Sequence, residues 1–132
     1  LETGLTYSGH PLACAAGIAA IKAYQDEALV ERSARLGDGM LERLHVMRAG
    51  HAAIGDVRGL GLFAVLEMNA TEGETSPCGF PHPMPWLKRL AHSALQRGAS
   101  VAVRGNLLIL CPPLLIEPRD LDWGLSVIET LL

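Results

Sequence analysis

Residues 54–68 read IGDVRGLGLFAVLEM. In the second half of this run two sets of residues alternate. One set is Leu62, Ala64 and Leu66, and the other is Phe63, Val65 and Glu67. A period of two that is rich in branched and aromatic residues is typical of a strand with one buried face. We therefore expect a β-strand over 54–68, with the rest of the chain arranged around it.

Two helical patterns precede this strand. Residues 12–24 (LACAAGIAAIKAY) are apolar or small nearly all round, which predicts a helix that is buried on most faces. Pro11 suits the first turn of that helix, because an N–H there has no helical partner. A second helix is predicted over 27–49, with Asp26 as its N-cap. Its inward positions are expected to be Val30, Ala34, Gly37, Leu41, Leu44 and either Met47 or Arg48.

A different pattern follows the strand. Residues 69–85 are rich in Pro and Gly and predict a long loop. Residues 86–97 predict a third helix, and Pro118 opens a last one. The inward face of the last helix is expected to hold Leu121, Leu125 and Ile128.

A hairpin is predicted between the last two helices. Gly105-Asn106 stands between the apolar runs 100–104 and 107–111, and a two-residue turn of this type joins antiparallel strands. In that register residue 102 faces 109 and residue 104 faces 107. The order of elements predicts an α+β fold, with a small, mostly antiparallel sheet covered by helices on one face.

Composition limits the function classes. The chain has 132 residues, 49% of them hydrophobic, and a net charge of −3, which fits one globular domain. Without a basic run or a long apolar stretch, neither a nucleic-acid nor a membrane partner is expected. The scattered cysteines Cys14, Cys78 and Cys111 predict reduced thiols in a cytoplasmic protein. Because the chain opens at Leu1 and soon enters an apolar helix, we interpret it as the later part of a longer protein. In residues 1–132 alone, helix 12–24 is therefore expected to expose a wide apolar patch.

Three short patterns do not support a site. The glycines of Gly59-Leu-Gly61-Leu-Phe-Ala64 match a dinucleotide fingerprint, but a β-favouring run follows them where a helix is required. Ser8 and His10 are too close in sequence for a nucleophile and its base, and no carboxylate follows to orient them. The five histidines lack the paired spacing of metal ligands, so no metal site is expected.

Two residues are candidates for binding. Thr6 lies in a glycine-flanked loop just before a helix, where a hydroxyl and helix N–H groups can converge on an anion, although most loop threonines bind nothing. Arg104 lies beside the hairpin turn and suits a carboxylate, although a single arginine beside a turn is commonly solvated.

Three segments together are similar to one family. GLTYSGHPLACAAGIAAI (4–21) resembles the TYSGHP segment of class III, pyridoxal-phosphate-dependent aminotransferases. GDVRGLGLFAVLEM (55–68) resembles the VRGLGL strand segment of that family, and GNLLILCPPLLI (105–116) resembles its C-terminal PPL segment. The three matches occur in family order and extend over nearly the whole chain.

This resemblance implies a fold type I enzyme that is active as a homodimer, with active sites at the subunit interface. Residues 1–26 are then the cofactor-phosphate loop and the helix leading from the large domain, and residues 27–132 are the C-terminal small domain. Thr6 matches the family's threonine that reaches across the dimer to the phosphate of pyridoxal 5'-phosphate in the partner subunit. Arg58 and its neighbouring glycines match a family motif that we interpret as structural.

The chain departs from the family at the residue that forms the covalent bond to the cofactor. The family's Schiff-base lysine lies upstream of TYSGHP, whereas this chain holds only Lys22 and Lys88, each in a helical pattern without that motif. We therefore expect the longer parent to be the aminotransferase and residues 1–132 alone to be inactive, with no catalytic residue of their own.

Substrate recognition is left open by two missing arginines. Ornithine-type and acetylornithine-type members carry an arginine that maps to Ile109, and many ω-amino-acid and diamine-type members carry one that maps to Ala102. Arg104 shares a face with both positions and is our candidate replacement for binding a carboxylate. The alternative is an enzyme that prefers an amine or aldehyde without a second carboxylate. The implied reaction moves an amino group between an amine or ω-amino acid and a keto acid such as pyruvate.

Two other functions are compatible with the resemblance. One is an aminomutase or racemase of the same fold, because the residues that decide this chemistry lie upstream. The other is a non-catalytic domain derived from the small domain, which the intact Thr6 segment argues against. A generic α+β binding module explains the composition but not the three ordered motifs.

Overall fold

The computed structural model describes residue 4, residues 6–69 and residues 84–132. Most of the loop predicted over 69–85 lies outside the described residues. In chain order the elements are α1 (Pro11–Asp26), α2 (Leu29–Gly50), β1 (Ile54–Leu60), β2 (Phe63–Met68), α3 (Pro85–Gln96), β3 (Ala102–Arg104), β4 (Leu107–Leu110) and α4 (Pro118–Leu131).

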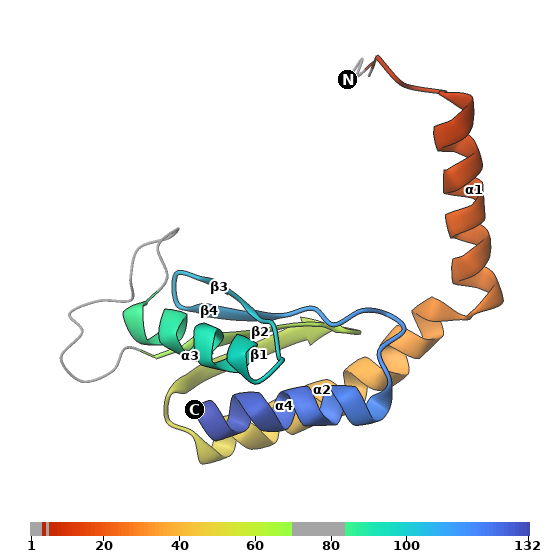
Figure 1. The fold of residues 1–132 in the computed structure, drawn as a ribbon. Helices are drawn as coiled ribbons and strands as arrows, with labels where there is room; N and C mark the ends of the chain where they lie inside the picture. Colours follow the sequence, from red (N-terminus) through yellow and green to blue (C-terminus); the bar gives the residue numbers. More distant parts are fainter. Residues whose placement is uncertain (1–3, 5, 70–83) are drawn as a thin grey trace.

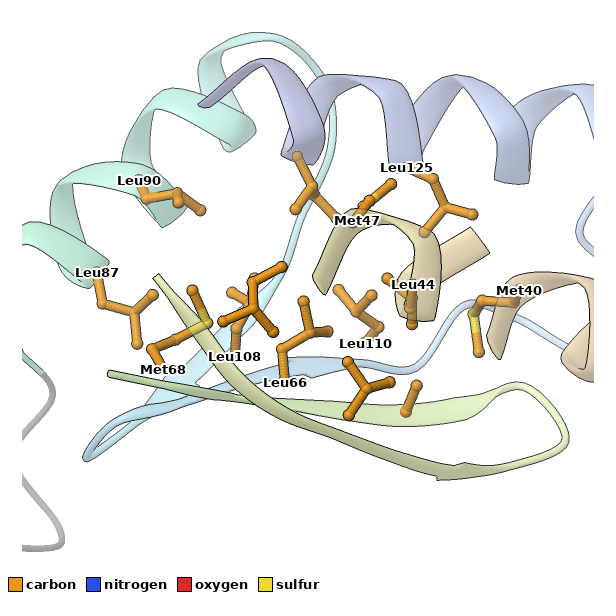
Figure 2. Close-up of a cluster of buried hydrophobic side chains, with 14 of the residues drawn as sticks. Met40, Leu44, Met47, Leu66, Met68, Leu87, Leu90, Leu108, Leu110 and Leu125 are labelled. Carbon is orange, nitrogen blue, oxygen red and sulfur yellow. The ribbon is translucent and has the colours of Figure 1, made fainter. Parts of the chain in front are cut away.

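The strands form one antiparallel sheet in the order β1-β2-β4-β3. Helices α2, α3 and α4 all lie on the same side of this sheet (Figures 1 and 2). The predicted α+β fold with helices on one face is therefore confirmed. The predicted hairpin is also correct, since Ala102 pairs with Ile109 and Arg104 with Leu107 around a turn in which Gly105 has a positive φ.

The prediction of a single strand over 54–68 is wrong. The chain reverses at Gly61 and Leu62, so this segment forms the antiparallel pair β1 and β2. Gly61 adopts φ +54°, a left-handed conformation that glycine takes without steric cost. The expected alternation in the second half is correct, because Leu62 and Leu66 are buried whereas Phe63 is exposed.

The core lies between the sheet and the three covering helices (Figure 2). Helix α2 contributes Met40, Leu44 and Met47, which are almost completely buried against strand residues such as Leu66 and Leu108. The face predicted for α2 is partly wrong, because its buried residues are Leu29, Gly37, Met40, Leu44 and Met47. The three inward leucine and isoleucine positions predicted for α4 are confirmed.

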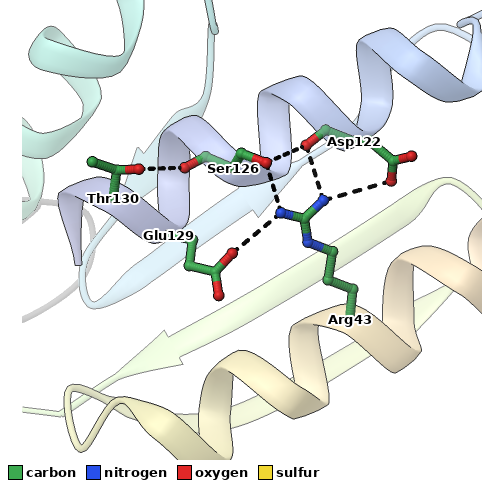
Figure 3. Close-up of polar contacts among 5 residues, drawn as sticks. All are labelled: Arg43, Asp122, Ser126, Glu129 and Thr130. Carbon is green, nitrogen blue, oxygen red and sulfur yellow. Dashed lines mark hydrogen bonds and ion pairs between the residues drawn. The ribbon is translucent and has the colours of Figure 1, made fainter.

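Polar contacts fix α2 to the C-terminal part of the chain. Arg43 donates hydrogen bonds to the Asp122 carbonyl oxygen (2.9 Å) and the Ser126 hydroxyl (2.7 Å), and it pairs with Glu129, all on α4 (Figure 3). Arg32 donates to the carbonyl oxygens of two residues in the segment between β4 and α4. These acceptors are Leu114 (3.2 Å) and Ile116 (2.7 Å).

Helix α1 projects away from these layers (Figure 1). It has no buried residue, so the burial expected for residues 12–24 is not found within the described structure. Its main contacts are with α2, and they leave large side chains such as Ile18, Ile21 and Tyr24 exposed. An apolar helix can be buried only where another element covers it.

The junction between α1 and α2 also differs from the prediction. Asp26 is the last residue of α1 and not the N-cap of α2. The N-cap is Ala28, which adopts a left-handed conformation (φ 47°, ψ 45°) and makes no side-chain cap. Asp26 instead pairs with Lys22 within α1, at 2.9 Å.

Candidate functional site

The candidate site begins with the sheet face that α2, α3 and α4 leave open. Alternation along the strands directs Val57, Leu66 and Leu108 into the core, so their neighbours in sequence point outward. The strand register aligns these outward residues in two rows: Arg58, Val65, Ile109 and Ala102 in one, and Asp56, Glu67, Leu107 and Arg104 in the other.

Arg104 ends β3 next to the hairpin turn and is exposed on this open face. Ala102 and Ile109 form the adjacent pair, one step farther from the turn. The register therefore brings the candidate Arg104 and the two positions without arginine to one patch, as the sequence predicted. Because Val65 pairs with Ile109, the patch continues as an apolar row onto β2.

A charged cluster occupies the other end of the open face. Arg58 donates hydrogen bonds to Asp56 (2.6 Å) and Glu67 (2.8 Å), and Arg48 of α2 also pairs with Asp56 (3.2 Å). The hydrogen bond from Arg58, followed by one from the Val57 N–H, holds the pKa of Asp56 below its ordinary value. Glu67 and then Asp56 raise the pKa of Arg58. These bonds agree with a structural role for Arg58.

Sequence reasoning did not identify this cluster. The alternation of residues along the strands could have indicated it, because Asp56 and Arg58 lie on the same face of β1 and Glu67 lies on the corresponding face of β2. Recognising it required the turn at Gly61, which pairs the two strands.

Thr6 lies in a turn before α1 and is exposed. Gly9 in the same turn has φ +74°, and the His10 N–H donates to the Tyr7 carbonyl oxygen at 3.2 Å. A Cβ built at Gly9 would meet nothing within 4 Å, so the turn borders open space. Figure 1 shows that the length of α1 separates this turn from the sheet. The structure therefore does not bring Thr6 and Arg104 together within one chain.

Neither lysine lies at the open face of the sheet. Lys22 is on α1, paired with Asp26, and Lys88 is exposed on α3. Among the described residues, no group of three or more His, Cys, Asp or Glu side chains could hold a metal ion. Within the same ranges, no helix is both long enough and apolar enough to span a bilayer.

The chain matches a known protein family along its whole length. The family model described as aminotransferase class-III matches residues 1–132. The chain belongs to the class III aminotransferase family. The resemblance of the three sequence segments to this family is therefore confirmed.

Individual class III aminotransferases are similar over nearly the whole chain. The omega-aminotransferase of Caulobacter vibrioides is 31% identical over 98% of this chain, and the ornithine aminotransferase of Bacillus cereus is 32% identical over 98%. The solved structure of an amine transaminase from an uncultivated Pseudomonas species, in a form with pyridoxal phosphate bound, has 32% identity and a TM-score of 0.85 over 99% of the chain. Nearly equal identities to differently named relatives do not select a substrate.

The chain spans only part of these aminotransferases. It covers 27% of the Caulobacter protein, 28% of the Bacillus protein and 29% of the Pseudomonas structure. The match is therefore to one portion of a longer family architecture.

Proposed function

We propose that residues 1–132 are the C-terminal part of a pyridoxal-phosphate-dependent aminotransferase that moves an amino group between an amine or ω-amino acid and a keto acid such as pyruvate. The observation that carries this proposal is the family match over residues 1–132, and the TM-score of 0.85 to an amine transaminase supports it. Within the proposed enzyme, residues 27–132 are the small domain, and residues 1–26 connect it to the large domain.

Thr6 is the residue of this chain that would hold the cofactor. A phosphate accepts hydrogen bonds, and the exposed Thr6 hydroxyl, in an open turn that precedes a helix, is a donor of the required kind. When bound, pyridoxal phosphate supplies temporary storage of the amino group between donor and acceptor. The separation of Thr6 from the sheet of its own chain supports a homodimer in which Thr6 serves the partner subunit.

The open face of the sheet would form one wall of the substrate entrance. The Arg104 guanidinium binds the carboxylate of the keto acid, and the row of Val65, Ile109 and Ala102 contacts the apolar part of the amine and excludes water there. Neither Lys22 nor Lys88 carries the cofactor, so residues 1–132 alone are inactive. The exposed free thiols of Cys14 and Cys111 support a cytoplasmic location.

The activity is tested on the full-length protein that carries this chain. With pyridoxal phosphate, an arylalkylamine donor and pyruvate, it is expected to form alanine, whereas residues 1–132 alone are expected to form none. If the full-length protein formed no amino acid from any keto acid in a panel, with amine and ω-amino-acid donors, the proposed reaction would be contradicted.

The role of Arg104 is tested by Arg104→Ala in the same full-length enzyme. Loss of a charge-assisted hydrogen bond, about 1.5–3 kcal/mol, predicts a KM for pyruvate raised roughly 10- to 150-fold, with a much smaller change in the KM for an amine donor that lacks a carboxylate. Arg119→Ala is the matched control, because Arg119 is an exposed arginine that pairs only with its neighbour Asp120 among the contacts described. An unchanged KM for pyruvate would favour substrates without a second carboxylate.

A further inference from the structure

A cavity of about 480 Å³ lies between α4, the segment that joins α3 to β3, and the segment that follows β4. Its volume is in the range of small-molecule sites, roughly 300–1,000 Å³. None of Ala102, Arg104 and Ile109 lines it. The cavity is therefore distinct from the candidate substrate patch on the open face of the sheet.

The lining is apolar with one negative charge. Met40 and Leu125 are among the aliphatic side chains that form its inner wall. Asp120 is the one carboxylate among the lining residues, and no lysine or arginine lines the cavity. Arg119 lies beside it, with its Nε 3.3 Å from Asp120 Oδ1, but both side chains are largely exposed and such a pair is weak.

Trp123 supplies an aromatic wall. Its indole ring lies against Gly98, where an added Cβ would come within 3.0 Å of the Trp123 Cη2 atom. Gly124, the next residue of α4, also lines the cavity, and it has no side chain to fill the space there. The indole is half exposed, so part of its surface is available to a ligand. An aromatic face close to a carboxylate is a combination that attracts organic cations.

We propose that this cavity binds an organic ammonium ion that carries an aromatic or branched apolar group. The apolar group lies among the aliphatic side chains, and the positive charge lies between the Asp120 carboxylate and the Trp123 ring. Anionic ligands are disfavoured because no cationic side chain lines the cavity. The proposal does not depend on transamination, since it involves no residue of the candidate substrate patch.

The cavity contains its own reporter. Cys111 lines it and its thiol is exposed, whereas Cys14 lies on α1, which contributes no residue to the cavity. Alkylation by iodoacetamide, followed by mass spectrometry at the peptides that contain Cys111 and Cys14, therefore measures occupancy at Cys111 with Cys14 as the internal reference. The probe is trimethyl(2-phenylethyl)ammonium, which has no N–H and forms no imine with a carbonyl group.

In the full-length protein we expect the probe to slow alkylation of Cys111 several-fold while alkylation of Cys14 is unchanged. Asp120→Asn should raise the probe concentration needed for half-protection about tenfold, and Trp123→Leu should also weaken protection. Asp122→Asn is the matched control, because this carboxylate on the same helix faces Arg43 and does not line the cavity.

Three results would overturn the proposal. The first is unchanged alkylation of Cys111 in the presence of the probe. The second is equal protection by the neutral compound 2-phenylethanol, which would show a merely apolar cavity. The third is a Cys111 that fails to react without the probe unless the protein is denatured, which would show that another part of the full-length protein fills the cavity.

Discussion

Helices α1 and α2 follow each other directly in the chain, yet they differ in how many side chains they bury and in where their polar side chains make contacts. Helix α1 is the more apolar of the two, and none of its 16 residues is buried. Helix α2 has many charged residues along its 22 positions, and it buries five residues, among them Met40, Leu44 and Met47. The polar side chains differ in the same way. Lys22 on α1 pairs within its own helix, whereas Arg32 on α2 holds a distant segment.

The difference shows that hydropathy alone does not decide burial. A helix with one apolar stripe and one charged face needs a single covering layer, and the sheet provides it for α2. A helix that is apolar nearly all round, such as α1, needs partners on several sides, and the other described residues supply contacts mainly at its α2 end. Within residues 1–132, stability should therefore depend on α2 and hardly at all on α1.

The largest expected loss of stability comes from shortening a buried apolar side chain on the face of α2 that packs against the sheet. Leu44 is 0% exposed, so Leu44→Ala should lower the free energy of unfolding by about 2–5 kcal/mol through lost burial and the remaining cavity. Ile21 of α1 is 62% exposed, and Ile21→Ala should cost less than about 0.5 kcal/mol in residues 1–132. Urea unfolding of both variants measures the contrast, and similar costs would contradict it.

The next effect concerns the closest approach of α2 to the sheet. A Cβ at Gly37 would overlap the backbone carbonyl group of Gly61 at the β1–β2 turn, so Gly37→Ala should destabilise by about 1–3 kcal/mol. Gly17 is the matched glycine in α1, with nothing within 4 Å of an added Cβ. Gly17→Ala should instead leave stability unchanged or raise it slightly through helix propensity, because α1 packs little against the rest of the described chain. The change in the urea midpoint of each variant decides the comparison.

A smaller effect is expected for the polar contacts. Arg32 has a side chain that is only 24% exposed, and Arg32→Met removes both hydrogen bonds to the segment after β4, at a cost of about 1–2 kcal/mol. Lys22→Met in α1 should change stability by no more than about 0.5 kcal/mol. Thermal unfolding of the two variants measures the difference. A Lys22→Met variant as unstable as Arg32→Met would mean that α1 is held by contacts outside its own helix.

The smallest effect is the dependence on pH at the end of α2. Arg48 and Arg58 pair with Asp56, whose pKa lies below its ordinary value of 3.8. A carboxyl with a lowered pKa contributes stability above the unfolded value, and that contribution is lost as the pH falls through the lower folded value. Asp56→Asn should therefore be slightly less stable than the unchanged protein at neutral pH, with a gap that closes below pH 3.8.

Unfolding at stepwise lower pH measures that gap. Asp38→Asn removes one negative charge from an exposed position on α2 and controls for net charge. A gap that stays constant throughout the acid range would show that ionised Asp56 is not its source.

The sequence predicted the elements with clear local signals. Gly105-Asn106 between two apolar runs predicted the β3–β4 register, and that register places Arg104 next to the pair formed by Ala102 and Ile109. The β1–β2 turn was missed because Leu60 and Leu62 surround Gly61 with apolar residues, so the turn resembles the interior of a strand. The apolar residues of α1 predicted a helix that needs a cover, and α1 is exposed here because hydropathy measures the tendency to be covered and not the presence of a cover. The wide apolar patch expected on this helix in residues 1–132 alone is therefore confirmed.

The candidate ligand cavity could not be predicted from the sequence. Its lining comes from segments as far apart as Met40, Gly98, Cys111 and Trp123, none of which forms a motif with the others. The spacing of Asp120 and Trp123 on α4 places them on one helix face, but only the folded arrangement adds the apolar walls from the other segments. Thr6, by contrast, was found from its local sequence, because a hydroxyl in a glycine-flanked loop before a helix needs no tertiary information to be noticed.

Ala28, in a left-handed conformation between α1 and α2, sets the direction in which α1 leaves the rest of the chain. At 1.5 Å per residue, α1 extends about 24 Å from this joint to the turn that carries Thr6. A rotation of roughly 10° at the joint therefore moves that turn by about 4 Å, more than the length of a hydrogen bond. The position of the Thr6 hydroxyl relative to the sheet is therefore sensitive to the backbone torsions of Ala28, about four turns of helix away.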